Sequence, residues 1–217
     1  MPKLSCYQTE NTLEAGVDEA GRGPAFGRIY AAAVIWPKDL DSNLVRDSKE
    51  IKKEADMKVS FDFVCNNAID YGIGYASVEE IDRLGVGQAN MVAMHRALDT
   101  LKLRPEQILV DGNYFQIYTD KKGNAINYGT VVGGDHKFYS IAAASILAKY
   151  SRDQYIKELC EEYPDLVARY DILRNKGYIS APKHKQGIEE FGITQFHRSS
   201  WKCCKEYPLT EVQPVPT

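Results

Sequence analysis

Residues 13–24 read LEAGVDEAGRGP, and this stretch predicts both a strand of a sheet and a chemical site. The apolar run that ends at Asp18 predicts a buried strand, and Gly21 and Gly23 predict a turn directly after it. Asp18 and Glu19 are adjacent acids at the end of this predicted strand. Adjacent strand residues point to opposite faces, so both acids can share one site only if the chain twists at Glu19.

The remaining sequence predicts an α/β fold with a mixed sheet covered by helices. Four further segments have the composition of strands: residues 29–36, 69–78, 107–110 and 127–132. Three segments have helical periodicity or small-residue composition: residues 50–68, 90–102 and 140–161. In residues 90–102 a stripe of Met and Leu is the kind of helix face that packs into a core, so we expect Met91, Met94, Leu98 and Leu101 to be core residues.

The sequence suggests three parts along the chain. Residues 1–160 hold the predicted sheet and central helix, and we expect them to form the core domain. Residues 161–207 form a helical and loop-like segment that carries the basic residues. Residues 208–217 have little to bury, and we expect them to form a mobile tail.

Composition limits the class of protein. The chain has 217 residues and a net charge of −3, and no apolar stretch approaches the ~20 residues that a membrane span requires. The N-terminus has no apolar signal region, so we expect a cytoplasmic protein. The five cysteines show no zinc-ligand spacing, which indicates reduced thiols.

Basic residues are concentrated near the C-terminus. Residues 169–205 hold eight basic and three acidic residues. A local excess of positive charge is typical of surfaces that bind phosphate backbones, although a merely solvated face would look the same.

Two more acids follow predicted strands and extend the site. Asp111 ends one strand, and Asp135 follows two glycines after another. Carboxylates brought together repel one another unless a cation lies between them, and ligand sets made only of oxygens suit Mg²⁺ or Mn²⁺. Each acid alone has another interpretation: Asp111 begins an Asp-Gly-Asn turn, and Asp135 could cap the following helix.

The triplet Gly21-Arg22-Gly23 suggests contact with a phosphate-bearing ligand. Glycines allow backbone amides to approach a ligand closely, and the arginine between them can address a phosphate. Taken alone the triplet is a weak signal, but it gains weight directly after Asp18-Glu19.

Together these motifs resemble those of the ribonuclease HII family. The resemblance is carried by GVDEAGRGP at 16–24, AAAVI at 31–35, DSK at 47–49, VDGN at 110–113, GGD at 133–135, SIAAASILAKYSRD at 140–153, KGY at 176–178 and HR at 197–198. The motifs follow one another in the family's order from about residue 13 to 201.

The resemblance implies a ribonuclease H-like mixed five-stranded sheet and an endonuclease that hydrolyses the RNA strand of RNA–DNA hybrids. It implies that four acids form a catalytic and metal-binding quartet with Mn²⁺ or Mg²⁺ as cofactor: Asp18, Glu19, Asp111 and Asp135. Two metal ions would support direct hydrolysis that leaves a 3′-hydroxyl and a 5′-phosphate. The expected partner is nucleic acid and not a membrane, and we expect a monomer.

The same resemblance assigns substrate contacts. Gly21, Arg22 and Gly23 would recognise the ribose 2′-hydroxyl, and Tyr178 would pack on the next sugar. That pairing would allow cleavage 5′ to a single ribonucleotide embedded in duplex DNA. Lys49 would contact phosphate. Without the resemblance, Tyr178 is an ordinary half-buried aromatic and Lys49 a solvated lysine.

The chain also departs from the family pattern. Phe26, Arg28, Trp201 and the segment His136–Tyr139 differ from the residues usual there, which bears on substrate fit more than on chemistry. His184 and His197 are expected to be structural or to contact phosphate. Two other functions stay open: a nuclease of the same fold directed at DNA, which would lack the 2′-hydroxyl reader, and a non-catalytic nucleic-acid-binding protein, which would need a broader basic surface.

Overall fold

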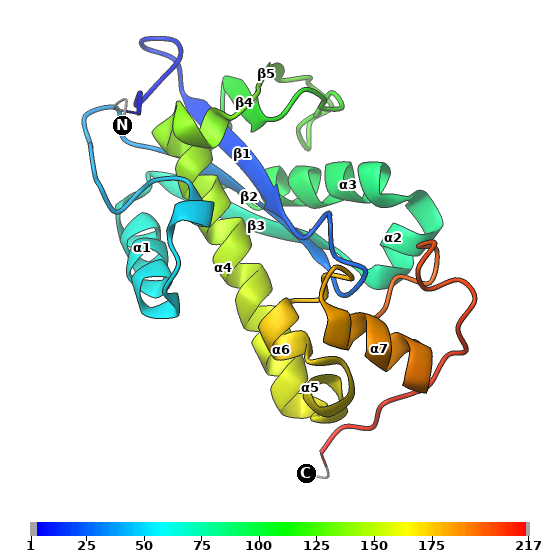
Figure 1. The fold of residues 1–217 in the computed structure, drawn as a ribbon. Coiled ribbons are helices and arrows are strands. Elements are labelled where there is room, and N and C mark those ends of the chain that lie inside the picture. Colours follow the sequence, from blue (N-terminus) through cyan, green and yellow to red (C-terminus); the bar gives the residue numbers. More distant parts are fainter. Residues whose placement is uncertain (1–3, 216–217) are drawn as a thin grey trace. The chain divides into compact units, whose positions relative to one another are not determined.

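The computed structural model describes residues 4–215, which contain a five-stranded sheet and several helices (Figure 1). The elements in chain order are β1 (Glu14–Ala20), β2 (Ile29–Ile35), η1 (Ser48–Glu50), α1 (Glu54–Asn67), β3 (Asp70–Ala76), α2 (Val78–Leu84), α3 (Val86–Asp99), β4 (Gln107–Asp111), β5 (Asn127–Val131), η2 (Gly134–His136), α4 (Tyr139–Glu162), α5 (Asp165–Tyr170), α6 (Ile172–Asn175) and α7 (Pro182–Phe191).

The sheet has the strand order β3-β2-β1-β4-β5. Strand β1 pairs antiparallel with β2 and parallel with β4, which in turn pairs parallel with β5. This arrangement confirms the predicted mixed sheet. Strand β1 continues to Ala20, two residues beyond the predicted end at Asp18, because its ladder with β2 extends to the pair Ala20 and Tyr30.

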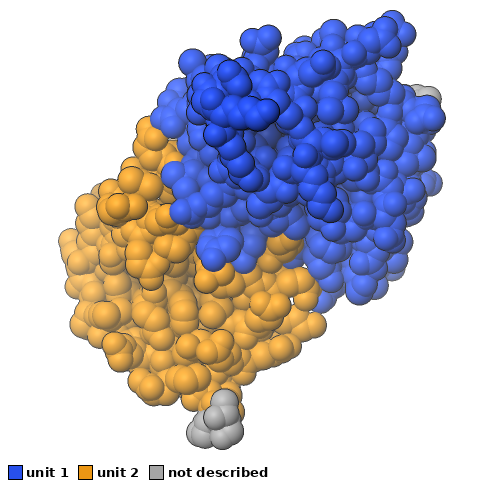
Figure 2. Space-filling view, turned by 180° about the vertical axis from the view of Figure 1, so that it is seen from behind, with its two compact units in different colours: residues 1–20, 30–75, 90–150 blue, residues 21–29, 76–89, 151–217 orange. Residues whose placement is uncertain are grey.

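The chain divides into two compact units, which Figure 2 colours separately. Unit 1 consists of residues 1–20, 30–75 and 90–150, and unit 2 of residues 21–29, 76–89 and 151–217. Helix α4 contributes its first half to unit 1 and its second half to unit 2.

The core of unit 1 packs the first half of α4 against the sheet. The alanine-rich part of α4 shares one buried cluster with α1 and β2, whose members include Val34, Met57, Val64, Ala144 and Leu147. Small side chains let the helix lie close to the strands. Gly16 in β1 shows how close, because a Cβ added there would overlap the backbone of Ser140.

Helix α3 packs against β3. An added Cβ at Gly72 or Gly74 would overlap backbone atoms of Ala97 or Ala93 in α3. The predicted core role of the Met and Leu stripe is confirmed for the three members inside the helix, which are at most 4% exposed: Met91, Met94 and Leu98. The fourth member, Leu101, lies beyond the end of α3 and is only partly buried.

The described C-terminal residues make contacts within unit 2. Val212 is 2% exposed, and Thr210 N donates to the carbonyl of Ile193 at 2.7 Å. Val215 N donates to the carbonyl of Glu162. One valine and several backbone groups of this segment thus have partners, while most of its other described side chains are exposed. Whether residues 208–217 form a mobile tail stays a prediction.

Within residues 4–215, no helix combines the length and apolar character needed to cross a lipid bilayer.

Candidate active site

Strand pairing in unit 1 brings Asp18 and Asp111 together. Val17 of β1 lies opposite Val110 of β4 in the parallel ladder, so the next residues, Asp18 and Asp111, are neighbours across adjacent strands. Neighbouring strands lie about 4.8 Å apart, so two carboxylates on such strands interact strongly. Asp18 is 5% exposed, whereas Asp111 is half-buried.

The turn after β5 adds Asp135 to this pair. Gly133 takes a left-handed conformation with φ of 63°, and the turn directs Gly134 N to Oδ1 of Asp111 at 2.7 Å. Asp135 lies in η2, four residues before the first residue of α4, so it does not occupy the N-cap of that helix. It is 2% exposed. The alternative in which Asp135 merely caps a helix is therefore not supported.

The carboxylates destabilise one another's charged forms. Burial, followed by repulsion from Glu19 and Asp111, raises the pKa of Asp18 well above its ordinary value. Burial also raises the pKa of Asp111, and repulsion from Asp135 adds to this rise, whereas the hydrogen bond from Gly134 N lowers the pKa. Groups that repel in this way require a cation to be ionised together. Their donor atoms are all oxygens, so they fit Mg²⁺ or Mn²⁺.

Lys49 supplies one positive charge to this cluster. Its Nζ lies 3.2 Å from Oδ2 of Asp135 and 3.9 Å from Oδ1 of Asp47. Burial alone would lower the pKa of Lys49, but attraction to Asp135 and Asp47 raises it. Lys49 therefore pairs with carboxylates and is not merely solvated. Its side chain is still 76% exposed and accessible to a ligand.

Glu19 is the predicted quartet member whose place in the group of acids is least defined by the fold. It lies opposite Ala31 in a ladder that runs in regular register through Ala20, so the chain shows no break in pairing at Glu19. Its charge nevertheless acts on Asp18. The structure thus groups Asp18, Asp111 and Asp135 with Lys49, while Glu19 acts on the group from the neighbouring position of β1.

The residues predicted to read the sugar lie in unit 2, where they contact one another. Gly21 adopts φ of 99°, which only glycine takes without strain. A Cβ on Gly23 would come within 3.3 Å of the Tyr178 ring, so the loop and the ring are in contact. Ala25 N donates to the carbonyl of Gly177 at 3.0 Å, which ties the KGY segment to the loop. Tyr178 is 48% exposed, so part of the residue is accessible to a ligand.

Two buried arginines hold this loop. Arg198 is fully buried and donates to the backbone carbonyls of Gly21, Arg22 and Gly27 at 2.5–3.0 Å. Arg152 is 3% exposed and donates to the carbonyls of Phe26 and Lys176. Arg198 is therefore not available to a surface that contacts phosphate, although it is one of the eight basic residues of segment 169–205.

Several of the other basic residues of segment 169–205 lie on the surface of unit 2. The side chains that remain exposed are Arg174, Lys183, Lys185, Lys202 and Lys205.

His184 and His197 form a buried pair. Their Nε2 atoms lie 3.0 Å apart, and both residues are at most 2% exposed. Burial, reinforced by His184, lowers the pKa of His197 to about 3, so the ring is neutral. Of the two expected roles, structural or phosphate-contacting, the burial supports the structural one. Phe26 packs edge-on against His197 with ring centroids 5.0 Å apart, so this departure from the family pattern is a core residue.

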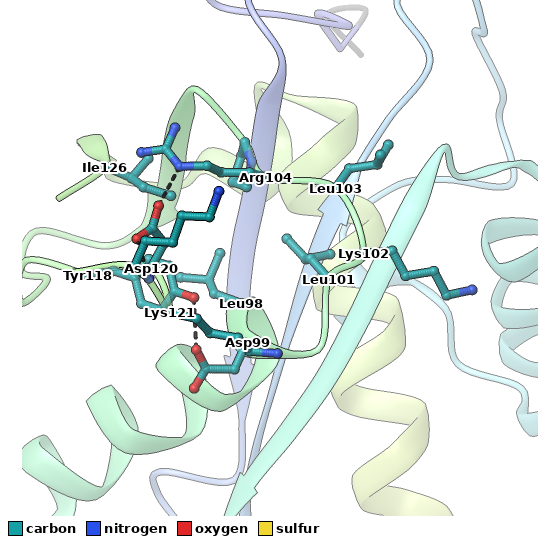
Figure 3. Close-up of a pocket in the computed structure, with 12 residues that line it drawn as sticks. Leu98, Asp99, Leu101, Lys102, Leu103, Arg104, Tyr118, Asp120, Lys121 and Ile126 are labelled. Atoms are coloured by element: carbon teal, nitrogen blue, oxygen red, sulfur yellow. Dashed lines mark hydrogen bonds and ion pairs between the residues drawn. The ribbon is translucent and has the colours of Figure 1, made fainter. Parts of the chain in front are cut away.

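A separate cavity of about 320 Å³ lies between the end of α3 and the segment before β5 (Figure 3). Tyr118 Oη donates to Asp99 there, and Arg104 Nε donates to Asp120. None of the predicted site residues lines it.

Comparison with known proteins agrees with this geometry. The family model described as Ribonuclease HII matches residues 15–204. The chain belongs to the ribonuclease HII family. It is 44% identical over 195 residues to the ribonuclease HII of Bacteroides thetaiotaomicron, covering 90% of this chain and 92% of the relative. Members of this family are ribonuclease H enzymes, so this chain is a ribonuclease H.

Solved structures support the ribonuclease H-like fold. The ribonuclease H2 of Pyrococcus horikoshii is 25% identical, with a TM-score of 0.74 over 89% of this chain and 95% of that one. A structure of Bst-RNase HIII in complex with Mn²⁺ has a TM-score of 0.61 at 17% identity, over 91% of this chain and 70% of that one.

Three residues near the ribonuclease HII motifs were not assigned a role from the sequence. Ser145 Oγ lies 2.9 Å from Ser48 Oγ and hydrogen-bonds to Asp18, so it ties η1 and α4 to the acids. Asp47 belongs to the DSK motif, in which the resemblance gives a role to Lys49 alone. His136 departs from the family pattern and lies 3.4 Å from Asp47.

Proposed function

We propose that this protein is an endonuclease that hydrolyses the RNA strand of RNA–DNA hybrids and also cuts 5′ to a single ribonucleotide embedded in duplex DNA. The observation that carries the proposal is the group of Asp18, Asp111 and Asp135, buried or half-buried carboxylates that repel one another when ionised and whose oxygens suit divalent cations. Such an activity serves the removal of ribonucleotides from DNA during replication and repair.

The acids would hold Mn²⁺ or Mg²⁺. Asp18, Asp111 and Asp135 would provide most of the oxygen ligands, with Glu19 contributing from the adjacent position of β1. Two such ions supply positive charge to the attacking and leaving oxygens of a phosphodiester. The Mn²⁺ in the solved Bst-RNase HIII structure, which shares the fold, is in keeping with this assignment.

The protein residues would carry the remaining steps. Lys49, held beside Asp135 and still exposed, would bind a phosphate oxygen of the substrate. Asp135 or Glu19 would accept a proton from water. Hydrolysis without a covalent intermediate would leave a 3′-hydroxyl and a 5′-phosphate.

Substrate choice would come from unit 2. The backbone of Gly21, Arg22 and Gly23 would hydrogen-bond to the ribose 2′-hydroxyl, which is the group that distinguishes RNA from DNA. Tyr178, in contact with Gly23, would pack on the sugar of the next nucleotide and favour deoxyribose there. These proposed contacts to the 2′-hydroxyl and the next sugar favour a ribonuclease over a nuclease directed at DNA.

The test compares three labelled duplexes with Mn²⁺ or Mg²⁺: a long RNA–DNA hybrid, a DNA duplex with one ribonucleotide, and the all-DNA duplex. We expect cleavage of the first two, with the single cut mapped 5′ to the ribonucleotide, and no cleavage with a chelator present. Cleavage of all-DNA duplex at the same rate would support the DNA-directed alternative. Duplex binding that is unaffected by chelator, without cleavage of any substrate, would indicate a non-catalytic binder.

A further inference from the structure

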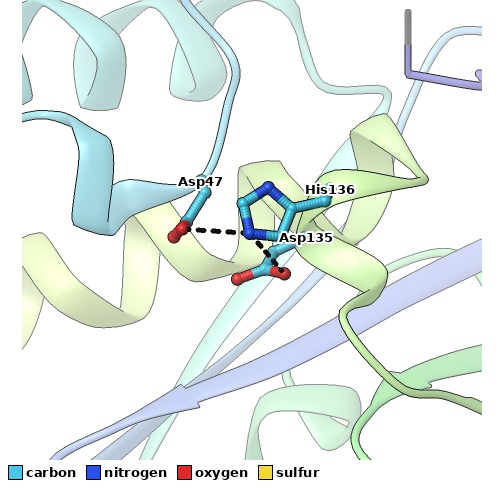
Figure 4. A group of neighbouring side chains, drawn as sticks. All are labelled: Asp47, Asp135 and His136. Atoms are coloured by element: carbon cyan, nitrogen blue, oxygen red, sulfur yellow. Dashed lines mark ion pairs between the residues drawn. The ribbon is translucent and has the colours of Figure 1, made fainter. Parts of the chain in front are cut away.

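Three potential metal ligands of unit 1 lie close together, and one of them, Asp135, also belongs to the group of Asp18, Asp111 and Asp135 (Figure 4). Asp47 precedes η1, and Asp135 and His136 belong to η2. Within the described residues these three offer ligand atoms that all lie within 4.8 Å of one another. The histidine and both carboxylates face one another in Figure 4.

The separations between these atoms fit a single ion. His136 Nε2 lies 3.4 Å from Oδ2 of Asp47 and 4.0 Å from Oδ1 of Asp135. Two ligands bound at ~2.1 Å from one ion are about 3.4 Å apart at a tetrahedral angle and about 4.2 Å apart when opposite. Small side-chain movements would therefore suffice for coordination.

The donor set differs in kind from that of the catalytic acids. An imidazole nitrogen with two carboxylates suits Zn²⁺, Co²⁺ or Ni²⁺, whereas Mg²⁺ prefers oxygen ligands alone. The side chains of Asp47 and Asp135 are 6% and 3% exposed, and both lie within 3.9 Å of the Lys49 ammonium group. A further positive charge would be favourable there.

An ion could reach this group from solvent. A cavity of about 450 Å³ is lined by all three ligands and by Glu50, and the His136 side chain is 56% exposed. The open side leaves room for the water molecules that would complete the coordination.

We propose that Asp47, Asp135 and His136 bind a transition-metal ion such as Zn²⁺, and that this ion inhibits cleavage. Oδ2 of Asp135 pairs with Lys49, and its Oδ1 faces His136. An ion on Oδ1 would compete with the catalytic ions for the same carboxylate. The inhibition, unlike the binding, rests on the proposed function, because it requires Asp135 to serve catalysis.

Binding is tested with Co²⁺ in the absence of Mg²⁺, because the visible absorption of Co²⁺ reports its ligands and a histidine ligand distinguishes this site from the oxygen-only site. We expect saturable absorption bands in the wild type and at least about tenfold weaker binding in His136→Gln. The matched control is His95→Gln, which removes a histidine of α3 and should retain wild-type binding. Equal Co²⁺ affinity in the wild type and His136→Gln would overturn the site.

Inhibition is tested by adding Zn²⁺ to the wild type and to His136→Gln while they cut the duplex with one ribonucleotide in Mg²⁺. We expect His136→Gln to require at least about tenfold more Zn²⁺ for half-inhibition. Equal sensitivity in the two proteins would overturn the inhibition and leave the binding site standing. If neither protein cuts any duplex without Zn²⁺, the proposed function fails, and the Co²⁺ spectra still decide whether the site exists.

Discussion

Nη2 of Arg198 donates a hydrogen bond of 2.5 Å to the carbonyl oxygen of Gly21, 177 residues earlier in the chain. The same guanidinium reaches the carbonyls of Arg22 and Gly27. A loop that is proposed to recognise a sugar through its backbone must hold its amide groups in place. The buried, planar guanidinium of Arg198 holds them here. Arg198 is therefore a positioning residue, because its contacts are with the loop.

Arg198→Lys should destabilise the protein and loosen this loop. A lysine ammonium lacks the extended, planar set of donors with which the guanidinium spans these carbonyls, and an incompletely bonded buried charge costs about 3 kcal/mol. Thermal denaturation should show a lower Tm, and the ratio of single-ribonucleotide to long-hybrid cleavage should fall. The exposed Arg174→Lys is the matched control and should change neither quantity. A wild-type Tm in Arg198→Lys would contradict this role.

Asp111→Asn should retain the fold, and its cleavage rate should fall by on the order of 10²–10³-fold or more. The amide oxygen can still accept the hydrogen bond from Gly134 N, so the turn should survive. Without metal, the variant should melt above the wild type, because a repelling charge has been removed. Added Mn²⁺ should raise the Tm of the wild type more than that of the variant.

The control for Asp111→Asn is Asp62→Asn, which removes a half-exposed carboxylate of α1 that pairs with Lys58. It should cleave normally and respond to Mn²⁺ like the wild type. Turnover of Asp111→Asn close to that of the wild type would rule out the metal assignment.

Tyr178→Ala should lower cleavage at a single ribonucleotide by roughly tenfold and affect long hybrids less, since loss of one aromatic packing contact costs ~1–3 kcal/mol. Tyr178→Phe keeps the ring that contacts Gly23 and should retain most of the activity on both substrates. Initial rates on the two duplexes provide the measurement. Equal losses on both substrates in Tyr178→Ala would argue against a sugar-reading role.

Acid should destabilise the fold through the buried histidine pair. The pKa of His197 is about 3 in the folded protein, against about 6.5 in the unfolded chain, so the unfolded state binds more protons below pH 6.5. The free energy of unfolding should therefore be unaffected by this group above pH 6.5. It should fall by up to ~1.4 kcal/mol per pH unit as the pH drops from 6.5 towards 3.

The raised pKa values of Asp18 and Asp111 act in the opposite direction, because protonation relieves their repulsion. Urea unfolding is therefore best measured in Asp18→Asn, Asp111→Asn double-variant protein at pH 7.5, 6.0 and 5.0. A constant free energy of unfolding over that range would contradict a neutral buried His197.

Local sequence patterns predicted the strands, the long helix α4 and the places of Asp18, Asp111 and Asp135. Strand ends and glycine turns are local properties, and their carboxylates carry a charge that a folded core must accommodate. The motif resemblance, confirmed by the family match over residues 15–204, then identified the kind of enzyme. What these patterns did not reveal is which distant groups each side chain meets.

The sequence by itself determined the fold class and the family, because apolar periodicity and motifs are properties of residues that lie close together in the sequence. Only the tertiary structure decided that Lys49 pairs with Asp135, that His136 faces Asp47, that Arg198 is buried under a loop, and that Val212 is buried. Every residue offers a backbone carbonyl, so a buried arginine bonded to carbonyls leaves no pattern at its partners. Such contacts arise when distant segments pack together, and they become visible only in three dimensions.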